Sequence, residues 1–171
     1  NQVEIGDTLK SNLSYSSKPN NFRLQNMISE QLTAQGFNEI MNNSLTKGDY
    51  YDELTVYPAT QSVKIMNPLS SDLNVMRQTL LFGGLESIAY NINRKHADLK
   101  LYEFGNCYQY HAAKRNEDDR LAAYKEEFHL GIWLTGQKHA QSWAVADGKT
   151  SVYELKAYVE NILLRMGVNR S

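Results

Sequence analysis

Alternating side-chain types between Leu101 and Tyr110 predict a β-strand with two unlike faces. In the stretch LYEFGNCYQY, one face carries a wall of aromatic side chains at Tyr102, Phe104, Tyr108 and Tyr110. The opposite face carries a single carboxylate, Glu103, among small and apolar neighbours. An enzyme could use such a group as an acid or to bind a ligand, and a scaffold could bury it with a partner. The pattern alone leaves both interpretations open.

A second strand is predicted in EFHLGIWLTG, where Phe128, Leu130, Ile132 and Leu134 share one face. It follows a highly charged connection, so the two strands are expected to pair antiparallel. Shorter strands are predicted in FNEIMNNSL and in VKIMNPLS, which stops at Pro68. The first holds Asn42, Asn43 and Ser44 where a purely structural strand would hold Val or Ile. Hydrogen bonds to a neighbouring loop and a functional role both explain those side chains.

Helical spacing of Leu24, Met27, Ile28 and Leu32 predicts an amphipathic helix from Asn21 to Gln35, with a cap at its start and Gly36 as its stop. A terminal helix is predicted in SVYELKAYVENILLRMG, where Ser151 and Glu154 form a capping box and Gly167 ends the helix. Strands and helices therefore intermix, which predicts an α+β domain with an antiparallel sheet flanked by helices.

Between these elements, Ser70 or Ser71 is expected to cap a long helical stretch that reaches Ile92. The adjacent Gly83 and Gly84 predict a turn or break within it. Residues 1–20 are rich in Ser and Asn and predict an extended arm or linker from a preceding domain. Residues 21–171 are predicted to form one core module that is truncated at its C-terminal end.

Composition narrows the function classes. A net charge of −1 over 171 residues argues against a dedicated nucleic-acid-binding module. The sequence has neither an apolar run long enough to span a membrane nor a signal-peptide pattern, so a cytoplasmic location without membrane partners is expected. The single cysteine, Cys107, excludes an internal disulfide and a multi-cysteine zinc site.

Motifs for catalysis and cofactor binding are missing. TKGDYY has the wrong spacing for a phosphate-binding loop, the four histidines are scattered, and no serine lies in a G-x-S-x-G elbow. No catalytic, cofactor-binding or metal-binding residue is therefore predicted. Arg77 is the one basic residue in a suggestive place: it could grip a phosphate or carboxylate, or it could pair with Asp72 or Glu103.

Several motifs, in order, resemble the C-terminal half of the β subunits of bacterial phenylalanyl-tRNA synthetases. They are NPLSSDLNVMRQTLLFGGLESIAYNINRK, LYEFGNCY, EEFHLGIWLTG and VYELKAYVENILL, and the resemblance covers nearly everything from Phe22 onward. It implies a fold like the catalytic domain of class II aminoacyl-tRNA synthetases, in a module that is catalytically silent beside an active α subunit. ATP and magnesium would serve the holoenzyme, with none bound here. Phe82 stands where the family usually has proline, which leaves the turn geometry there open.

Electrostatics agree with a silent module. Forming an aminoacyl adenylate places negative charge on a phosphate, so the site needs several cations. Active class II enzymes have an arginine and a following acid in their second motif, whereas LYEFGNCY, in the equivalent place, holds no arginine. Arg115 and Arg120 could substitute, but the acidic NEDD between them partly neutralises both. A third motif is expected beyond Ser171.

The resemblance therefore predicts a structural and assembly module of phenylalanine-tRNA ligase, partnered by the catalytic α subunit and, in the assembled enzyme, by tRNA. Glu103 and Gly105 are expected to be motif-like residues with a structural role, and the isolated chain is expected to self-associate. A free-standing adenylating enzyme and a tRNA-binding adaptor that uses Arg94, Lys95 and Lys100 remain alternatives. Class II folds dimerise through their first motif, which predicts a subunit interface at Leu24, Met27, Ile28, Met66, Pro68, Met76 and Arg77.

Overall fold

The computed structural model describes residues 20–139, 142–144 and 148–168. The predicted arm of residues 1–20 lies outside this part of the chain except for Asn20. The helices and longer strands are α1 (Asn21–Ala34), α2 (Leu81–Ile92), β4 (Leu99–Tyr110), β5 (Tyr124–Thr135) and α3 (Val152–Arg165). The short strands are β1 (Asn38–Glu39), β2 (Leu45–Thr46) and β3 (Val75–Met76), and the 3-10 helices are η1 (Gly48–Tyr51), η2 (Ala59–Gln61), η3 (Ser71–Leu73) and η4 (Ala112–Lys114).

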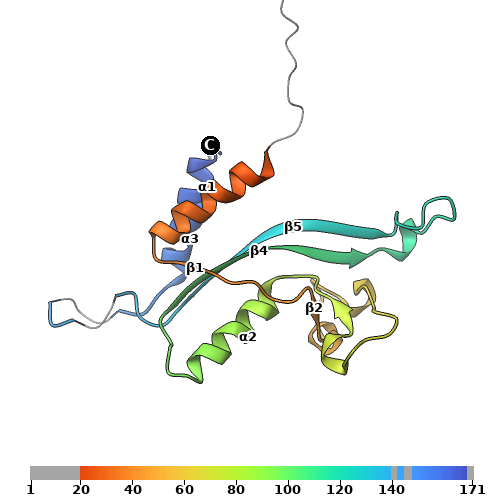
Figure 1. The fold of residues 1–171 in the computed structure, drawn as a ribbon, viewed down its shortest axis with the longest axis horizontal. Helices are drawn as coiled ribbons and strands as arrows, with labels where there is room; N and C mark the ends of the chain where they lie inside the picture. The colour runs from red at the N-terminus through yellow and green to blue at the C-terminus, as the bar shows by residue number, and fades with distance from the viewer. Residues whose placement is uncertain (1–19, 140–141, 145–147, 169–171) are drawn as a thin grey trace, which may run out of the picture.

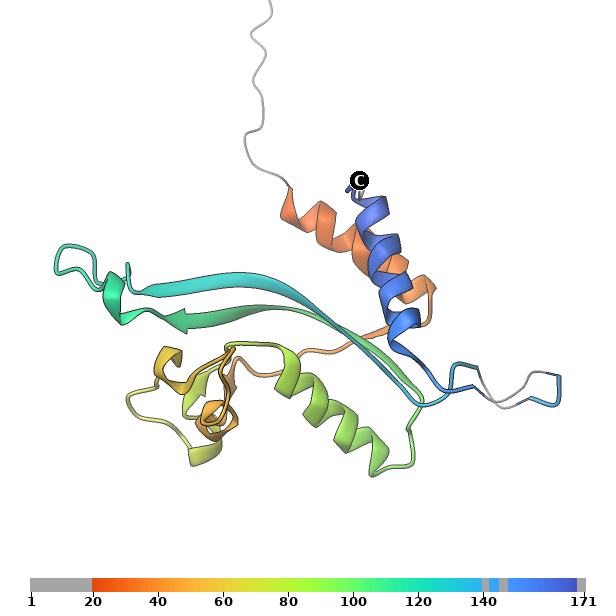
Figure 2. The same cartoon turned by 180° about the vertical axis from the view of Figure 1, so that it is seen from behind.

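A long, twisted hairpin of β4 and β5 forms the centre of the fold (Figure 1). Its antiparallel register runs from Leu99 opposite Thr135 to Tyr110 opposite Tyr124, which confirms the predicted pairing. Strand β1 adds to the other edge of β4 in parallel, with Asn38 opposite Leu101, so the sheet is mixed. Helices α1 and α3 cover one side of the hairpin, and α2 lies with β2 on the other (Figures 1 and 2).

Two hydrophobic cores use the two faces of β4. On the side of α1 and α3, Tyr102 packs with Leu32 and Ile162. On the side of α2, Leu101 packs with Ile88 and Trp133. Because neighbouring residues of a strand point to opposite sides, Tyr102 and Phe104 of the predicted aromatic wall join the first core, and the face that carries Glu103 joins the second.

The boundaries of α1 and α3 follow local sequence signals. The Asn20 side chain accepts a hydrogen bond from the Arg23 N–H at 3.0 Å, and the Ser151 hydroxyl accepts one from the Glu154 N–H at 3.4 Å. Gly36 follows α1 with φ +86°, a left-handed conformation that glycine adopts without strain. Both predicted helices are confirmed. Within the described ranges, no helix is long and apolar enough to cross a membrane.

The predictions for residues 63–80 were wrong. VKIMNPLS forms no strand and contributes only an isolated bridge between Lys64 and Val75. The helix expected from Ser70 or Ser71 begins only at Leu81, after η3 and β3. The reason is tertiary: the Met76 N–H donates to the Val63 carbonyl, and the Arg77 N–H donates to the Ser44 carbonyl, both at 2.9 Å. These bonds to distant segments hold Val75 and Met76 extended against the local helical pattern.

The break predicted at Gly83 and Gly84 was also wrong, because both glycines lie inside α2. A Cβ on Gly84 would lie 2.1 Å from the Trp133 indole, so the missing side chain permits close helix-to-sheet packing. Phe82, where the family usually has proline, belongs to the first turn of α2 and stacks on Tyr50 with ring centroids 4.6 Å apart. The turn geometry that the sequence left open is therefore helical.

Candidate functional site

Arg77 and Glu103, the two residues for which the sequence left a functional and a structural role open, form one buried ion pair. Arg77 Nη1 lies 2.6 Å from Glu103 Oε1, and the two residues are 7% and 1% exposed. Of the two partners considered for Arg77, the structure selects Glu103, because Asp72 pairs with Lys47 at 3.3 Å on the surface. A buried pair of this kind needs further hydrogen bonds to offset the loss of solvation.

Asn42 supplies those bonds to the carboxylate. Its backbone N–H donates to Glu103 Oε1 at 3.1 Å, and its side-chain amide donates to Oε2 at 2.7 Å. The Ser87 hydroxyl then donates to Asn42 Oδ1 at 2.9 Å, which ties the network to α2. The polar side chain at Asn42, which the sequence left between two interpretations, is explained by this structural role. Both carboxylate oxygens of Glu103 are occupied.

Arg77 is held in place from the β4 side as well. Its Nε donates to the Asn106 carbonyl at 2.9 Å. Its guanidinium lies across Gly105, where a Cβ would come within 2.0 Å of Arg77 Nη2. Gly105 is therefore required for close approach, as glycines in strand interiors often are. Nearby, burial raises the pKa of the Cys107 thiol, which keeps it protonated and a poor nucleophile.

The network can therefore stabilise the fold but offers little to a substrate. The Arg77 cation is neutralised and enclosed, and the Glu103 carboxylate accepts three hydrogen bonds from protein groups. In the part of the chain that the structure describes, no group of three or more His, Cys, Asp or Glu side chains could hold a metal ion. Arg115 and Arg120, the proposed substitutes, are exposed in the loop between β4 and β5, far along the hairpin from this network.

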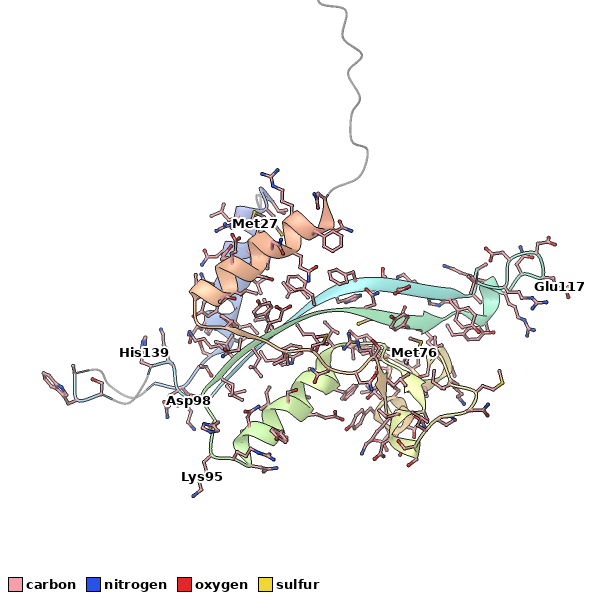
Figure 3. All side chains as sticks on the ribbon, in the orientation of Figure 1. Met27, Met76, Lys95, Asp98, Glu117 and His139 are labelled. Carbon is pink, nitrogen blue, oxygen red and sulfur yellow. The ribbon has the colours of Figure 1, made fainter. Side chains whose placement is uncertain are left out.

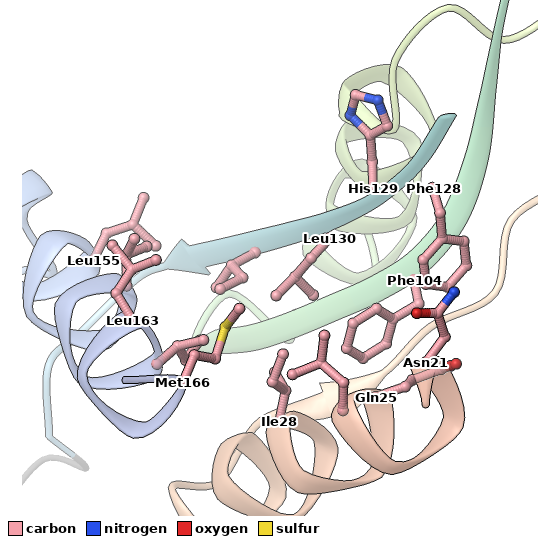
Figure 4. Close-up of a pocket in the computed structure, with 14 residues that line it drawn as sticks. Asn21, Gln25, Ile28, Phe104, Phe128, His129, Leu130, Leu155, Leu163 and Met166 are labelled. Carbon is pink, nitrogen blue, oxygen red and sulfur yellow. The ribbon is translucent and has the colours of Figure 1, made fainter. Parts of the chain in front are cut away.

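An apolar groove lies between α1 and α3 over the aromatic face of the hairpin (Figure 4). It has a volume of about 590 Å³. Its walls include Leu24 and Ile28 from α1, Leu163 from α3, and Met166, the residue that follows α3. Leu24 and Ile28 were predicted to contact another subunit, but Ile28 is only 6% exposed and packs in the first core. Met27, the third predicted contact on α1, is half-buried.

The remaining residues of the predicted interface differ in how exposed their side chains are. Met66 is 92% exposed and Pro68 is exposed, whereas Met76 is half-buried and Arg77 is enclosed. Leu69, which is not among the predicted contacts, is 95% exposed. Leu69 follows Pro68 in a segment that was predicted to be a strand, so nothing in the sequence indicated that its side chain is exposed. Met66, Pro68 and Leu69 together are called the 66–69 loop below. The interface itself stays a prediction.

Comparison with known proteins identifies the family. A sequence model described as "Phenylalanyl tRNA synthetase beta chain CLM domain" matches residues 6–171. The chain belongs to this family. Similar curated proteins of this CLM domain family are the phenylalanine--tRNA ligase beta subunits of Bacteroides fragilis, 59% identical over 99% of the chain, and Porphyromonas gingivalis, 50% identical over 98%. The CLM domain spans 21% of the length of each of these relatives.

Solved structures show the fold of the CLM domain independently. A pyrrolysyl tRNA synthetase, PylSc of Desulfitobacterium hafniense, has a TM-score of 0.57 to this structure. The match covers 90% of the chain and 47% of the length of the PylSc chain. An ATP phosphoribosyltransferase regulatory subunit/histidyl-tRNA synthetase from Bacillus halodurans has a TM-score of 0.58. That match covers 98% of the chain and 40% of the length of the Bacillus protein. Both are 16% identical, so they establish the class II synthetase-like fold alone. The predicted fold class is confirmed.

Proposed function

We propose that this CLM domain is a non-catalytic assembly module of the β subunit of a phenylalanine-tRNA ligase. It would pair with a catalytic α subunit in the cytoplasm, in an enzyme that uses ATP and magnesium to attach phenylalanine to its tRNA. The relatives' names support the ligase, and the enclosed Arg77 supports the silence of this domain.

The Arg77 network carries this proposal. An adenylating site must present cations to the α-phosphate of ATP. Arg77 is the buried cation among the described residues, and its guanidinium is already committed to Glu103 and to backbone carbonyls. Removing it from this network would leave the Glu103 carboxylate buried without a counter-charge, which costs several kcal/mol. A nucleotide would have to offset that cost before it gained any stabilisation.

An assay of amino-acid activation tests directly whether this domain lacks catalytic activity. Phenylalanine-dependent exchange of labelled pyrophosphate into ATP is expected from the full-length β subunit combined with its α partner. The CLM domain alone is expected to give no exchange above background, because no free cation of the network can bind phosphate. Exchange catalysed by the isolated domain, with phenylalanine or another amino acid, would instead support a free-standing adenylating enzyme.

The 66–69 loop offers a test of assembly. Large apolar side chains that are almost fully exposed, such as Met66 at 92% and Leu69 at 95%, gain most from burial against a partner. We expect the double change Met66→Asp and Leu69→Asp to weaken binding of the full-length β subunit to α by at least about tenfold, since each buried side chain contributes about 1.5–3 kcal/mol. Co-purification and sedimentation measure the effect.

Leu121→Asp provides the matched control, because Leu121 is 74% exposed at the far tip of the hairpin. This change should leave assembly intact. If the double variant assembles as well as the wild type, the interface does not include the 66–69 loop.

A further inference from the structure

Two segments that are distant in sequence meet at the open end of the hairpin. The turn after α2 holds Lys95 and Asp98, and the segment after β5 holds Gln137. Asp98 Oδ1 accepts the Gln137 N–H at 2.8 Å, and the Thr135 hydroxyl donates to the Ala97 carbonyl at 2.5 Å. Lys95, Asp98 and His139 accordingly lie at the same end of the molecule in Figure 3.

The segment between β5 and α3 leaves the sheet from a fixed root. The Lys138 N–H donates to the Gly148 carbonyl at 2.7 Å, and the Thr150 N–H donates to the Gly136 carbonyl at 3.0 Å. Gly136 has φ +77°, and a Cβ there would lie 2.1 Å from Asp98 Oδ1. Only glycine fits at this contact. The root thereby fixes where the segment leaves the domain.

The exposed side chains at this end are predominantly basic. Lys95, His96, Lys138, His139 and Lys149, called the basic end below, are all exposed. None of them forms an ion pair with another residue in the described ranges. Asp98 is the acid at the root, and its carboxylate already accepts a hydrogen bond. The sequence adds one more acid, Asp147, which lies outside the described residues.

Among the described residues, the opposite end of the hairpin has no comparable excess of positive side chains. There, the exposed cations Lys114, Arg115 and Arg120 are balanced by the exposed acids Glu117, Asp118 and Asp119. At the basic end, by contrast, the cationic side chains outnumber Asp98, the described acid at the root. Clustered cations of this kind are the electrostatic footprint of a nucleic-acid backbone.

Trp143 adds a second, independent feature. It lies in the segment that leaves this root, and its side chain is 100% exposed. Its described sequence neighbours, Ser142 and Ala144, are small, unlike the apolar side chains that surround an anchor residue in a protein interface. An exposed indole in the same chain segment as Lys138 and Lys149 matches the way proteins combine stacking on unpaired bases with phosphate contacts.

We propose that the basic end binds the tRNA of the assembled ligase, with Lys95, Lys138 and Lys149 on phosphates and Trp143 stacked on an unpaired base. This inference rests on the proposed function, since it takes its ligand from it. A protein partner is the less favoured occupant, because the surface combines charge with a single aromatic side chain instead of an apolar patch.

The test uses the full-length β subunit assembled with α, and measures binding of a labelled phenylalanine tRNA by fluorescence anisotropy at several salt concentrations. The triple change Lys95→Ala, Lys138→Ala and Lys149→Ala should weaken binding about tenfold and reduce the slope of log K against log salt by about 2. Trp143→Ala should weaken binding about tenfold with the slope unchanged, because stacking releases no counterions.

Two matched controls show whether the loss of tRNA binding is specific to the basic end and Trp143, or follows from removing any exposed charge or aromatic side chain. Lys114→Ala, Arg115→Ala and Arg120→Ala remove the same charge from the opposite end, and Phe22→Ala removes another aromatic side chain that is 81% exposed. Both should bind tRNA like the wild type.

Wild-type affinity and slope in the triple variant and in Trp143→Ala would overturn the proposal. Loss of α-subunit binding in these variants, with tRNA affinity unchanged, would also overturn it and identify a protein contact. The proposed function is judged separately, by whether the wild-type assembly charges phenylalanine tRNA.

Discussion

Replacing Glu103 by Ala is expected to lower the free energy of unfolding of this domain by about 3–5 kcal/mol, because it leaves the Arg77 guanidinium buried without a counter-charge. The change also removes the acceptor of the Asn42 N–H and side-chain amide. Urea denaturation followed by circular dichroism measures the loss. Breaking a buried network of charges and hydrogen bonds is one of the few changes that give an effect this large.

A double-mutant cycle shows whether the pair acts as a unit. Arg77→Met combined with Glu103→Met should destabilise the domain by less than the sum of the two single changes, because neither charge is then left alone. Asp72→Ala, which removes the exposed partner of Lys47, is the control and should change stability little. Additive single changes would mean that Arg77 and Glu103 do not stabilise each other.

Gly84→Ala is expected to destabilise the domain by about 1–3 kcal/mol through overpacking, although alanine is the better helix former by about 1 kcal/mol. The new methyl group would meet the Trp133 indole at 2.1 Å. That ring is only 9% exposed, and it also lies against Gly131, where a Cβ would come within 2.3 Å of it. The indole therefore has to leave its position. The midpoint of urea unfolding measures the effect.

Gly148→Ala is the matched control, because a Cβ on Gly148 would meet no atom within 4 Å. This change should leave stability nearly unchanged. Trp133→Phe in the Gly84→Ala background should recover part of the loss, since the smaller ring leaves space for the methyl group. A stabilising Gly84→Ala would show that helix propensity outweighs the packing contact.

Local signals were sufficient for the outer helices and the long hairpin. The apolar spacing of α1, with Asn20 before it and Gly36 after it, lies within one stretch of sequence and needs no distant partner. The alternation in β4 likewise records which face each side chain takes. These patterns survive in the structure because packing on both faces of the hairpin agrees with them.

Other features depend on contacts that local sequence does not record. Arg77 and Glu103 meet across 26 positions, so the sequence could name the pair only as one of two choices. Gly84 looked like a helix breaker because propensity scales ignore the Trp133 ring that fills the space above it. The basic end was visible only as Arg94, Lys95 and Lys100. Arg94 in fact lies over the Tyr90 ring, and Lys100 bonds to Tyr158, whereas Lys138 and Lys149 come from a later segment.

The division of β4 between two cores restricts where this domain can change in length. One inserted or deleted residue within the strand would exchange its faces, and would place Glu103 among the aromatic rings and Tyr102 against α2. The connection between β4 and β5 bears no such constraint, because its residues 112–121 are exposed. Length variation among related proteins is therefore expected in that connection, while the paired strands keep a constant residue count.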